Sequence, residues 1–256
     1  MQKEELKFEN STILEGMTSI SSLIEAKELK INDRKIYRIY YDVERKEKLD
    51  RKISYLRRKS VEIGFEIIET DADFINSRCI GNSHGGIIAE CSLRTIPSIL
   101  GSDTVKNGFY VMIQGVEDPY NFGYALRSLY ACGCDGVILP ERNWMGAAGV
   151  VARSSAGASE LMSVFISEAG ECADYFSAKG YKIVAADERG EKFLHDADLC
   201  RPILLIIGGE KRGISRALLE KCNEFVKINY GRRFDASLSA ASAATILGYE
   251  VMIKNL

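Results

Sequence analysis

The sequence has no long hydrophobic run: none of its apolar stretches reaches the roughly 18 residues that a membrane-spanning helix needs. Its first residues are mostly polar and contain no apolar core of a secretory signal, so we expect a cytoplasmic protein. Histidine is scarce, with two in 256 residues, which argues against a metal site built from histidines. The seven cysteines are scattered, and the one close pair, Cys132 and Cys134, lacks the further ligands that zinc requires. We therefore expect reduced thiols with a structural role and no bound metal.

An excess of charge of one sign is also lacking. The 34 basic and 36 acidic residues give a formal net charge of −2, so any binding of nucleic acid must use a local basic patch. The sequence has neither a Gly-x-Gly-x-x-Gly opening a first strand–helix unit nor the Gly-Lys-Ser/Thr of a nucleotide-triphosphate loop. The missing dinucleotide pattern counts against a nicotinamide-dependent oxidoreductase.

The most informative stretch runs from Pro202 to Ser215. Five consecutive apolar residues, 203–207, predict a strand that is buried on both faces. Glycines follow at 208, 209 and 213, and they let bare backbone approach whatever lies beyond the end of the strand. Such a loop either lines a cofactor pocket or makes an ordinary turn.

From Phe109 onward, segments typical of strands alternate with helical segments. The predicted strands cover 110–114, 136–139, 181–185, 203–207 and 225–228, with an extended segment at 161–166. The predicted helices cover about 124–131, 149–155, 169–178 and 238–253, with a short helix after Ser215. This alternation predicts a mostly parallel sheet covered by helices on both faces.

The first half predicts a small α/β domain, and residues 98–108 are expected to form the linker that follows it. A helical region at 10–28 is followed by strands at 36–41, 65–68 and 87–90, with a basic helix at 45–59. That helix carries eight basic and two acidic residues, a local net charge of +6. Its apolar residues Leu49, Ile53 and Leu56 lie at helical spacing, so one face packs and the rest is charged. The charged side is either a solvated face or a surface that follows RNA phosphates. The loop at 81–86, which contains His84 and several glycines, can bind RNA or simply turn.

Four segments of the second half form an ordered set of motifs. They are Asp118–Ser128, with Asn-x-Gly at 121–123 and an arginine at 127; Arg153–Glu160; Gly208–Gly213; and Ser237–Ala244. Together they resemble the SpoU/TrmH branch of the SPOUT superfamily, which are S-adenosylmethionine-dependent RNA 2′-O-ribose methyltransferases. The resemblance implies an α/β fold with a SPOUT-type, mostly parallel sheet and a C-terminal trefoil knot over residues 106–256. Residues 81–89 are similar to the His-Gln-Gly-Ile-Val-Ala signature of the RNA substrate-binding domain that precedes many such enzymes, which implies a small α/β RNA-binding domain at 1–105.

The resemblance also implies roles for single residues. Catalytic roles fall to Asn121, Arg127 and Ser239, and S-adenosylmethionine binding falls to Gly208, Gly209, Glu210, Gly213, Ile228, Ser237 and Leu238. RNA binding is expected from Arg45, Lys48, Arg57, Arg58, Lys59, His84 and Arg153. Methyl transfer from a sulfonium is an in-line displacement, so the enzyme must align the methyl donor with the hydroxyl and manage one proton. Because the pKa of arginine exceeds about 12, we expect Arg127 to position the substrate rather than act as the base.

The sequence departs from the family pattern at two points. Ser239 stands where the family has asparagine, which exchanges an amide for a shorter hydroxyl. The loop after Ile228 lacks the usual proline and carries Arg232 and Arg233. The small residues of the last helix suit a knotted tail and a partner subunit in a homodimer, or a closely packed core helix. We expect ribosomal RNA rather than transfer RNA as the substrate, and the main alternative is a non-catalytic RNA-binding protein that retains the fold.

Overall fold

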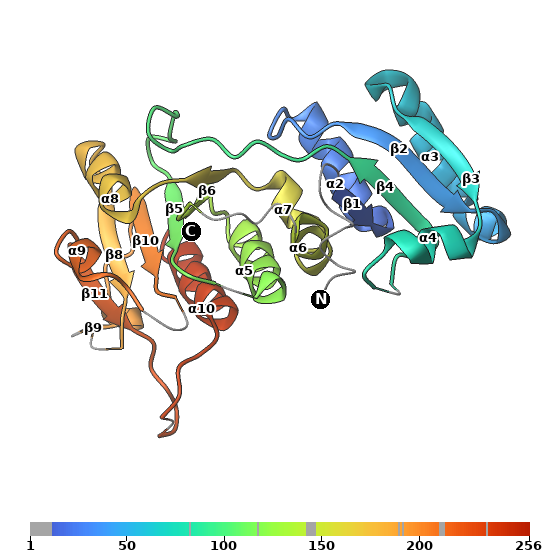
Figure 1. Cartoon of the computed structure of the whole chain (residues 1–256). Coiled ribbons are helices and arrows are strands. Elements are labelled where there is room, and N and C mark those ends of the chain that lie inside the picture. Colours follow the sequence, from blue (N-terminus) through green and yellow to red (C-terminus); the bar gives the residue numbers. More distant parts are fainter. Residues whose placement is uncertain are drawn as a thin grey trace. The chain divides into compact units, whose positions relative to one another are not determined.

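The computed structural model describes residues 12–256 except 82, 117, 142–146, 189, 191, 210–212 and 234. The chain forms two compact units (Figure 1). The first contains the described residues of Met1–Thr95 and Asn143–Leu161, and the second those of Ile96–Arg142 and Met162–Leu256. Among the residues described, no helix combines the length and the apolar character that a membrane crossing needs.

The first unit is built on a four-stranded sheet in the order β1-β4-β2-β3. Its strands are β1 (Thr12–Glu15), β2 (Ile36–Asp42), β3 (Glu66–Thr70) and β4 (Ile87–Cys91). Strand β4 is antiparallel to β1 and β2, whereas β2 and β3 are parallel. The strands predicted at 36–41, 65–68 and 87–90 are confirmed within one or two residues at either end.

The helices of this sheet are α2 (Gly16–Glu28), α3 (Lys46–Ile63) and α4 (Ala72–Arg78), and a 3₁₀ turn, η1 (Val43–Arg45), precedes α3. The basic helix is confirmed, and Leu49, Ile53 and Leu56 are its buried residues, as their spacing predicted. The predicted helical region at 10–28 is wrong at its start, because β1 occupies residues 12–15. Helix α4 was not predicted.

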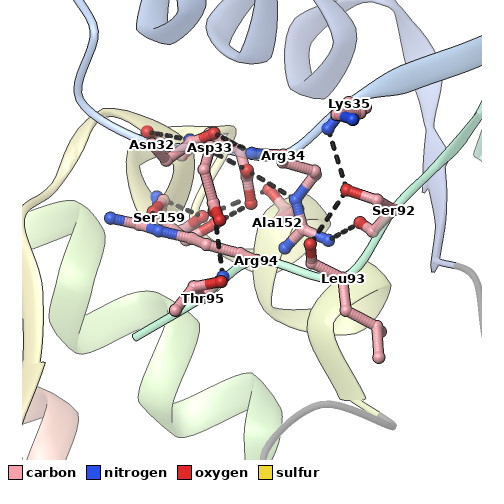
Figure 2. Close-up of polar contacts among 12 residues, drawn as sticks. Asn32, Asp33, Arg34, Lys35, Ser92, Leu93, Arg94, Thr95, Ala152 and Ser159 are labelled. Atoms are coloured by element: carbon pink, nitrogen blue, oxygen red, sulfur yellow. Dashed lines mark hydrogen bonds and ion pairs between the residues drawn. The ribbon is translucent and has the colours of Figure 1, made fainter. Parts of the chain in front are cut away.

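Two short helices, α6 (Ala148–Ser154) and α7 (Ala158–Leu161), belong to the first unit although the strands before and after them belong to the second. A buried polar network holds them (Figure 2). Arg34 Nε lies 3.0 Å from Glu160 Oε2, and both side chains are less than 5% exposed. Asn32 Nδ2 donates to the Glu160 carbonyl at 2.8 Å. Arg94 Nη1 donates to the Ser159 carbonyl at 2.7 Å. Every group in this buried network needs its partner, because an unpaired buried charge is costly.

The second unit contains a seven-stranded sheet in the order β7-β6-β5-β10-β8-β11-β9, and all its pairings are parallel. The strands are β5 (Phe109–Ile113), β6 (Gly136–Leu139), β7 (Val164–Ile166), β8 (Lys182–Ala186), β9 (Lys192–Phe193), β10 (Ile203–Ile207) and β11 (Glu224–Lys227). The helices are α5 (Pro119–Ala131), α8 (Ala169–Ala178), α9 (Arg216–Leu219) and α10 (Ala240–Ile253), with a 3₁₀ turn η3 (Leu194–Asp196) after β9. The prediction of a mostly parallel α/β sheet is confirmed.

Strand β10 lies at the centre of this sheet, and all five of its residues are buried, as predicted. Its residues alternate between the two faces. Leu204 and Ile206 pack with Tyr110 and with Phe176 of α8 on one face. Helix α10 contacts β10 and packs along α5.

Two sequence predictions are corrected here. The expected linker at 98–108 packs against the second sheet, because Ile99 is buried and its N–H donates to the carbonyl of Ile166 at 3.0 Å. The extended segment expected at 161–166 begins at Val164, because Leu161 ends α7.

Candidate functional site

The glycines that follow β10 lie against the end of β5. A Cβ atom on Gly209 would lie 2.2 Å from the carbonyl oxygen of Gln114, and one on Gly115 would lie 3.3 Å from Gly209 Cα. Gly115 also has a φ of 77°, in the left-handed region that favours glycine. The two chain segments can therefore approach this closely only because both residues lack side chains.

The loop after β10 closes on itself. The N–H of Gly209 donates to the carbonyl of Gly213 at 3.2 Å, and the N–H of Gly213 donates back at 3.0 Å. Glu210, which we expected to bind the cofactor, lies outside the described residues. Gln114, which the sequence reasoning missed, accepts the N–H of Ser215 on its side-chain oxygen at 3.4 Å and donates its own N–H to Ile207. The Gln-Gly pair directly after a buried strand was the available signal.

The first motif forms the start of α5. Asp118 caps the helix, because its carboxylate accepts the N–H of Tyr120 at 3.1 Å and of Asn121 at 3.3 Å. Pro119 occupies the first turn, where a proline costs no hydrogen bond. The helix was predicted to begin near residue 124 and begins at Pro119. Asn121 is half-buried and Arg127 is exposed; the described residues provide Arg127 with no hydrogen bond or ion pair.

The last motif forms the start of α10. Ser239 caps this helix, with its Oγ accepting the N–H of Ser242 at 3.2 Å. Leu238 was predicted to begin the helix but lies before the cap; it is half-buried, and its N–H donates to the hydroxyl of Tyr230 at 3.2 Å. Ser237 is exposed, and Ile228 is half-buried directly after β11. The hydroxyl at 239 therefore already has a backbone partner.

Helices α5 and α10 run side by side in the same direction. Thr245 Oγ1 lies 2.7 Å from Ser128 Oγ, and one turn further along a Cβ on Gly248 would lie 3.0 Å from a methyl carbon of Leu129. Because α5 follows β5 directly, its first turn lies at the carboxyl edge of the parallel sheet. The parallel packing brings the start of α10 to the same end. All the motifs of the second unit thus meet at one edge.

Apolar side chains and bare glycine backbone, the groups that could hold the adenosine of S-adenosylmethionine, lie at this edge. The glycines after β10 pack with bare backbone against Gln114, Gly115 and Gly213, and Ile228 and Leu238 add half-buried apolar surface. Small-molecule sites combine apolar walls with a few backbone hydrogen-bonding groups in this way. The part of the chain that the structure describes has no cluster of three or more side chains suited to a metal ion.

The basic residues of α3 fall into two groups. Lys59 lies 2.6 Å from both Glu28 and Glu62, and its hydrogen bonds to these carboxylates raise its pKa above the usual value. Its charge is therefore already balanced within the fold. The others are exposed, and those without an ion pair among the described residues are Lys48, Arg51, Lys52, Arg57 and Arg58.

Two further expected RNA ligands are engaged inside the first unit. His84 is buried, and its Nδ1 accepts the N–H of Gly86 at 3.1 Å. That bond places the ring proton on Nε2, which lies 3.0 Å from Asn76 Oδ1. Arg153 Nη1 lies 2.9 Å from Glu15 Oε2. His84 thus has no spare ring nitrogen for RNA, and Arg153 is held by a carboxylate.

Comparison with known proteins points to one group of enzymes. The model of the SpoU rRNA Methylase family matches residues 108–249, more than half of the chain. A putative TrmH family tRNA/rRNA methyltransferase of Staphylococcus haemolyticus is 33% identical over 171 residues, covering 66% of this chain and 68% of that protein. The 23S rRNA (guanosine-2′-O-)-methyltransferase RlmB of Shewanella oneidensis is 28% identical over 184 residues, covering 70% and 75%.

Solved structures show the same fold. The SpoU methyltransferase AviRb from Streptomyces viridochromogenes, in complex with AdoMet, has a TM-score of 0.78 at 23% identity and covers 99% of this chain and 97% of its own. An AdoMet-bound rRNA methyltransferase from Sinorhizobium meliloti has a TM-score of 0.79 at 20% identity, covering 99% and 90%. The likeness extends over both compact units.

Proposed function

The chain belongs to the SpoU rRNA methylase family, and we propose that it transfers a methyl group from S-adenosylmethionine to a ribose 2′-hydroxyl of structured RNA in the cytoplasm. Membership of this family makes it an S-adenosylmethionine-dependent RNA methyltransferase. The ribose hydroxyl and ribosomal RNA are the proposed target. Their support is the relative from Shewanella oneidensis, a 23S rRNA (guanosine-2′-O-)-methyltransferase.

The observation that carries the proposal is the meeting of the motifs at the carboxyl edge of the second sheet. The glycine turn after β10, with Gly208, Gly209 and Gly213, is proposed to bind the donor together with Ile228, Ser237 and Leu238. The donor supplies the activated methyl group, and the chain aligns the ribose hydroxyl with it. Glu210 is proposed as a further cofactor residue on the resemblance alone.

Arg127 is proposed to position the RNA, with Asn121 and Ser239 near the reacting groups. Its guanidinium is exposed and has no carboxylate partner among the described residues, so its donors are available to a phosphate. By binding a phosphate of the RNA, Arg127 would hold the neighbouring ribose in line with the methyl group.

We propose that the first unit binds RNA and that residues 106–256, apart from the segment at 143–161 that belongs to the first unit, form the methyltransferase domain, with a trefoil knot at the C-terminus. On α3 the unpaired basic residues form the proposed contact surface, with Arg58 lying 5.8 Å from the Tyr55 ring. The Tyr55 ring is half-buried beside these cations, and an aromatic ring next to cations suits RNA, which presents both phosphates and bases. Lys59 is proposed to stabilise the helix instead.

A homodimer through the second unit is proposed from an exposed apolar face. Helices α5 and α10 pack together and expose six large apolar or aromatic side chains, Tyr120, Tyr124, Tyr130, Ile246, Tyr249 and Ile253. Such a patch is typical of an interface. Arg127 lies three residues after Tyr124 and three before Tyr130, on the same side of α5, so a second copy would border the site.

Calorimetry with S-adenosylmethionine, followed by methyl transfer to an in vitro transcribed 23S rRNA, tests the function. We expect heat of binding and one ribose 2′-O-methyl group, located by reverse-transcription stops. Absence of heat would favour the second candidate, a non-catalytic RNA-binding protein, for which the replacement of asparagine by Ser239 is the supporting observation. Methylation of transfer RNA and not of ribosomal RNA would identify transfer RNA as the substrate.

A further inference from the structure

Glu15, at the end of β1, contacts two segments that are far apart in the sequence, residues 80–81 and Arg153. Its Oε1 accepts the N–H of Ile80 at 2.7 Å and lies 3.5 Å from the N–H of Gly81. Its Oε2 pairs with Arg153 at 2.9 Å, and the carboxylate is 6% exposed. A buried carboxylate with this many partners fixes the geometry of all of them.

Arg153 lies directly on Gly81. A Cβ atom at Gly81 would lie 1.6 Å from Arg153 Nη1 and 2.6 Å from its guanidinium carbon. Only glycine leaves room for the guanidinium, which remains 22% exposed. The contact between Arg153 and Gly81 is therefore close-packed and depends on the glycine.

The other end of the same loop has a second arginine on a second glycine. A Cβ on Gly86 would lie 2.6 Å from Arg45 Cδ, and the carbonyl oxygen of Gly86 accepts the N–H of Asp42 at 2.9 Å. Arg45 pairs with Asp42 at 3.4 Å but is 55% exposed. The loop of residues 80, 81 and 83–86, which we call the glycine loop, is therefore bracketed by two arginine–carboxylate pairs.

The middle of the glycine loop is open. Ser83 and Gly85 are exposed, and a Cβ on Gly85 would have no atom within 4 Å. The buried ring of His84 stabilises the loop through its hydrogen bonds to Gly86 and Asn76. Beside this open backbone the guanidinium of Arg45 is 55% exposed and can donate to a phosphate of a nucleic-acid backbone.

We propose that the glycine loop is a contact site for the RNA backbone, in which Arg45 contacts phosphate while Glu15 and Arg153 act as positioning residues. This inference rests on the proposed function, since it takes RNA as the ligand. On this inference, the motif at Arg153–Glu160 positions residues of the RNA-binding unit. It also assigns a role to Glu15, which sequence reasoning did not single out.

A double-mutant cycle tests the inference. Gly81→Ala displaces the end of a flexible side chain, so the fold survives and the guanidinium moves. We expect Gly81→Ala and Arg153→Ala each to weaken binding of the 23S rRNA transcript about tenfold, and the double variant to be no weaker than Arg153→Ala alone. S-adenosylmethionine binding, measured by calorimetry, should stay unchanged in all three.

A second variant, Glu15→Gln, keeps the size of the side chain and removes its charge. We expect faster hydrogen exchange at the amides of Ile80 and Gly81, a higher KM for RNA and an unchanged kcat. Wild-type RNA affinity in Gly81→Ala, or losses that multiply in the double variant, would overturn the inference while the methyltransferase function stands. Failure of the wild-type protein to bind or methylate any RNA would remove both.

Discussion

Substitution of Gly209 by alanine tests the geometry of the donor site most directly. The added methyl carbon would lie 2.2 Å from the carbonyl oxygen of Gln114 and 3.0 Å from Gly115 Cα. Carbon and oxygen approach no closer than about 3.3 Å without strain, so the ends of β5 and β10 must separate by about 1 Å. Both obstructing atoms belong to the backbone and cannot rotate away.

Overpacking of this kind costs about 1–3 kcal/mol, which lowers Tm by about 2–12 °C in a chain of this size. A shift of about 1 Å at a reacting centre reduces the rate about 100-fold. We therefore expect a folded Gly209→Ala variant with strongly weakened S-adenosylmethionine binding by calorimetry. Gly231→Ala is the matched control, because its Cβ would have no atom within 4 Å. Full affinity for the donor in folded Gly209→Ala would refute the placement of the site.

Three other predictions concern separate parts of the molecule. Arg127→Ala should reduce single-turnover methyl transfer about 100-fold or more while donor affinity changes less than about twofold, and unaltered turnover would remove its positioning role. Neutralising three unpaired cations of α3 should lower the slope of log K against log salt by about 2–3; the residues are Lys48, Arg51 and Arg58. Lys59→Ala should leave that slope unchanged and lower Tm instead, because its charge is already paired with two carboxylates. Burial raises the pKa of the Cys134 thiol to about 12, so the unfolded chain ionises first and the free energy of unfolding should fall as pH rises from about 9 toward 12. Cys134→Ala should flatten that decline in urea titrations at pH 8 and 10, and an equally steep decline would refute it.

Local patterns predicted the second unit well because its signals are short-range. The apolar run of β10 and the regular spacing of strands and helices depend on neighbouring residues alone. The start of α5 was placed five residues late, although Asp118 followed by Pro119 is a recognised signal for a helix start. The Asn-x-Gly motif that follows them has a composition typical of a turn, so the predicted helix began after this motif.

Long-range pairings in the first unit could not be predicted in the same way. Ile13 and Leu14 continue the helical spacing of the apolar residues that follow them, such as Met17, and only pairing with β4 makes residues 12–15 a strand. The buried pair of Arg34 and Glu160 joins residues 126 positions apart. Nothing in the sequence alone assigns the segment around Glu160 to the first unit.

The backbone at the end of β10 explains why the sequence lacks a phosphate-binding pattern. Phosphate loops direct several free N–H groups at one anion. Here the N–H groups of Gly209 and Gly213 donate to each other's carbonyls, so neither is free for a phosphate. S-adenosylmethionine carries a sulfonium and no phosphate, and a turn that closes on itself between apolar residues suits it. In the proposed function, phosphate recognition falls to guanidinium groups, at Arg127 in the second unit and at Arg45 in the first, because the RNA is the ligand that carries phosphates.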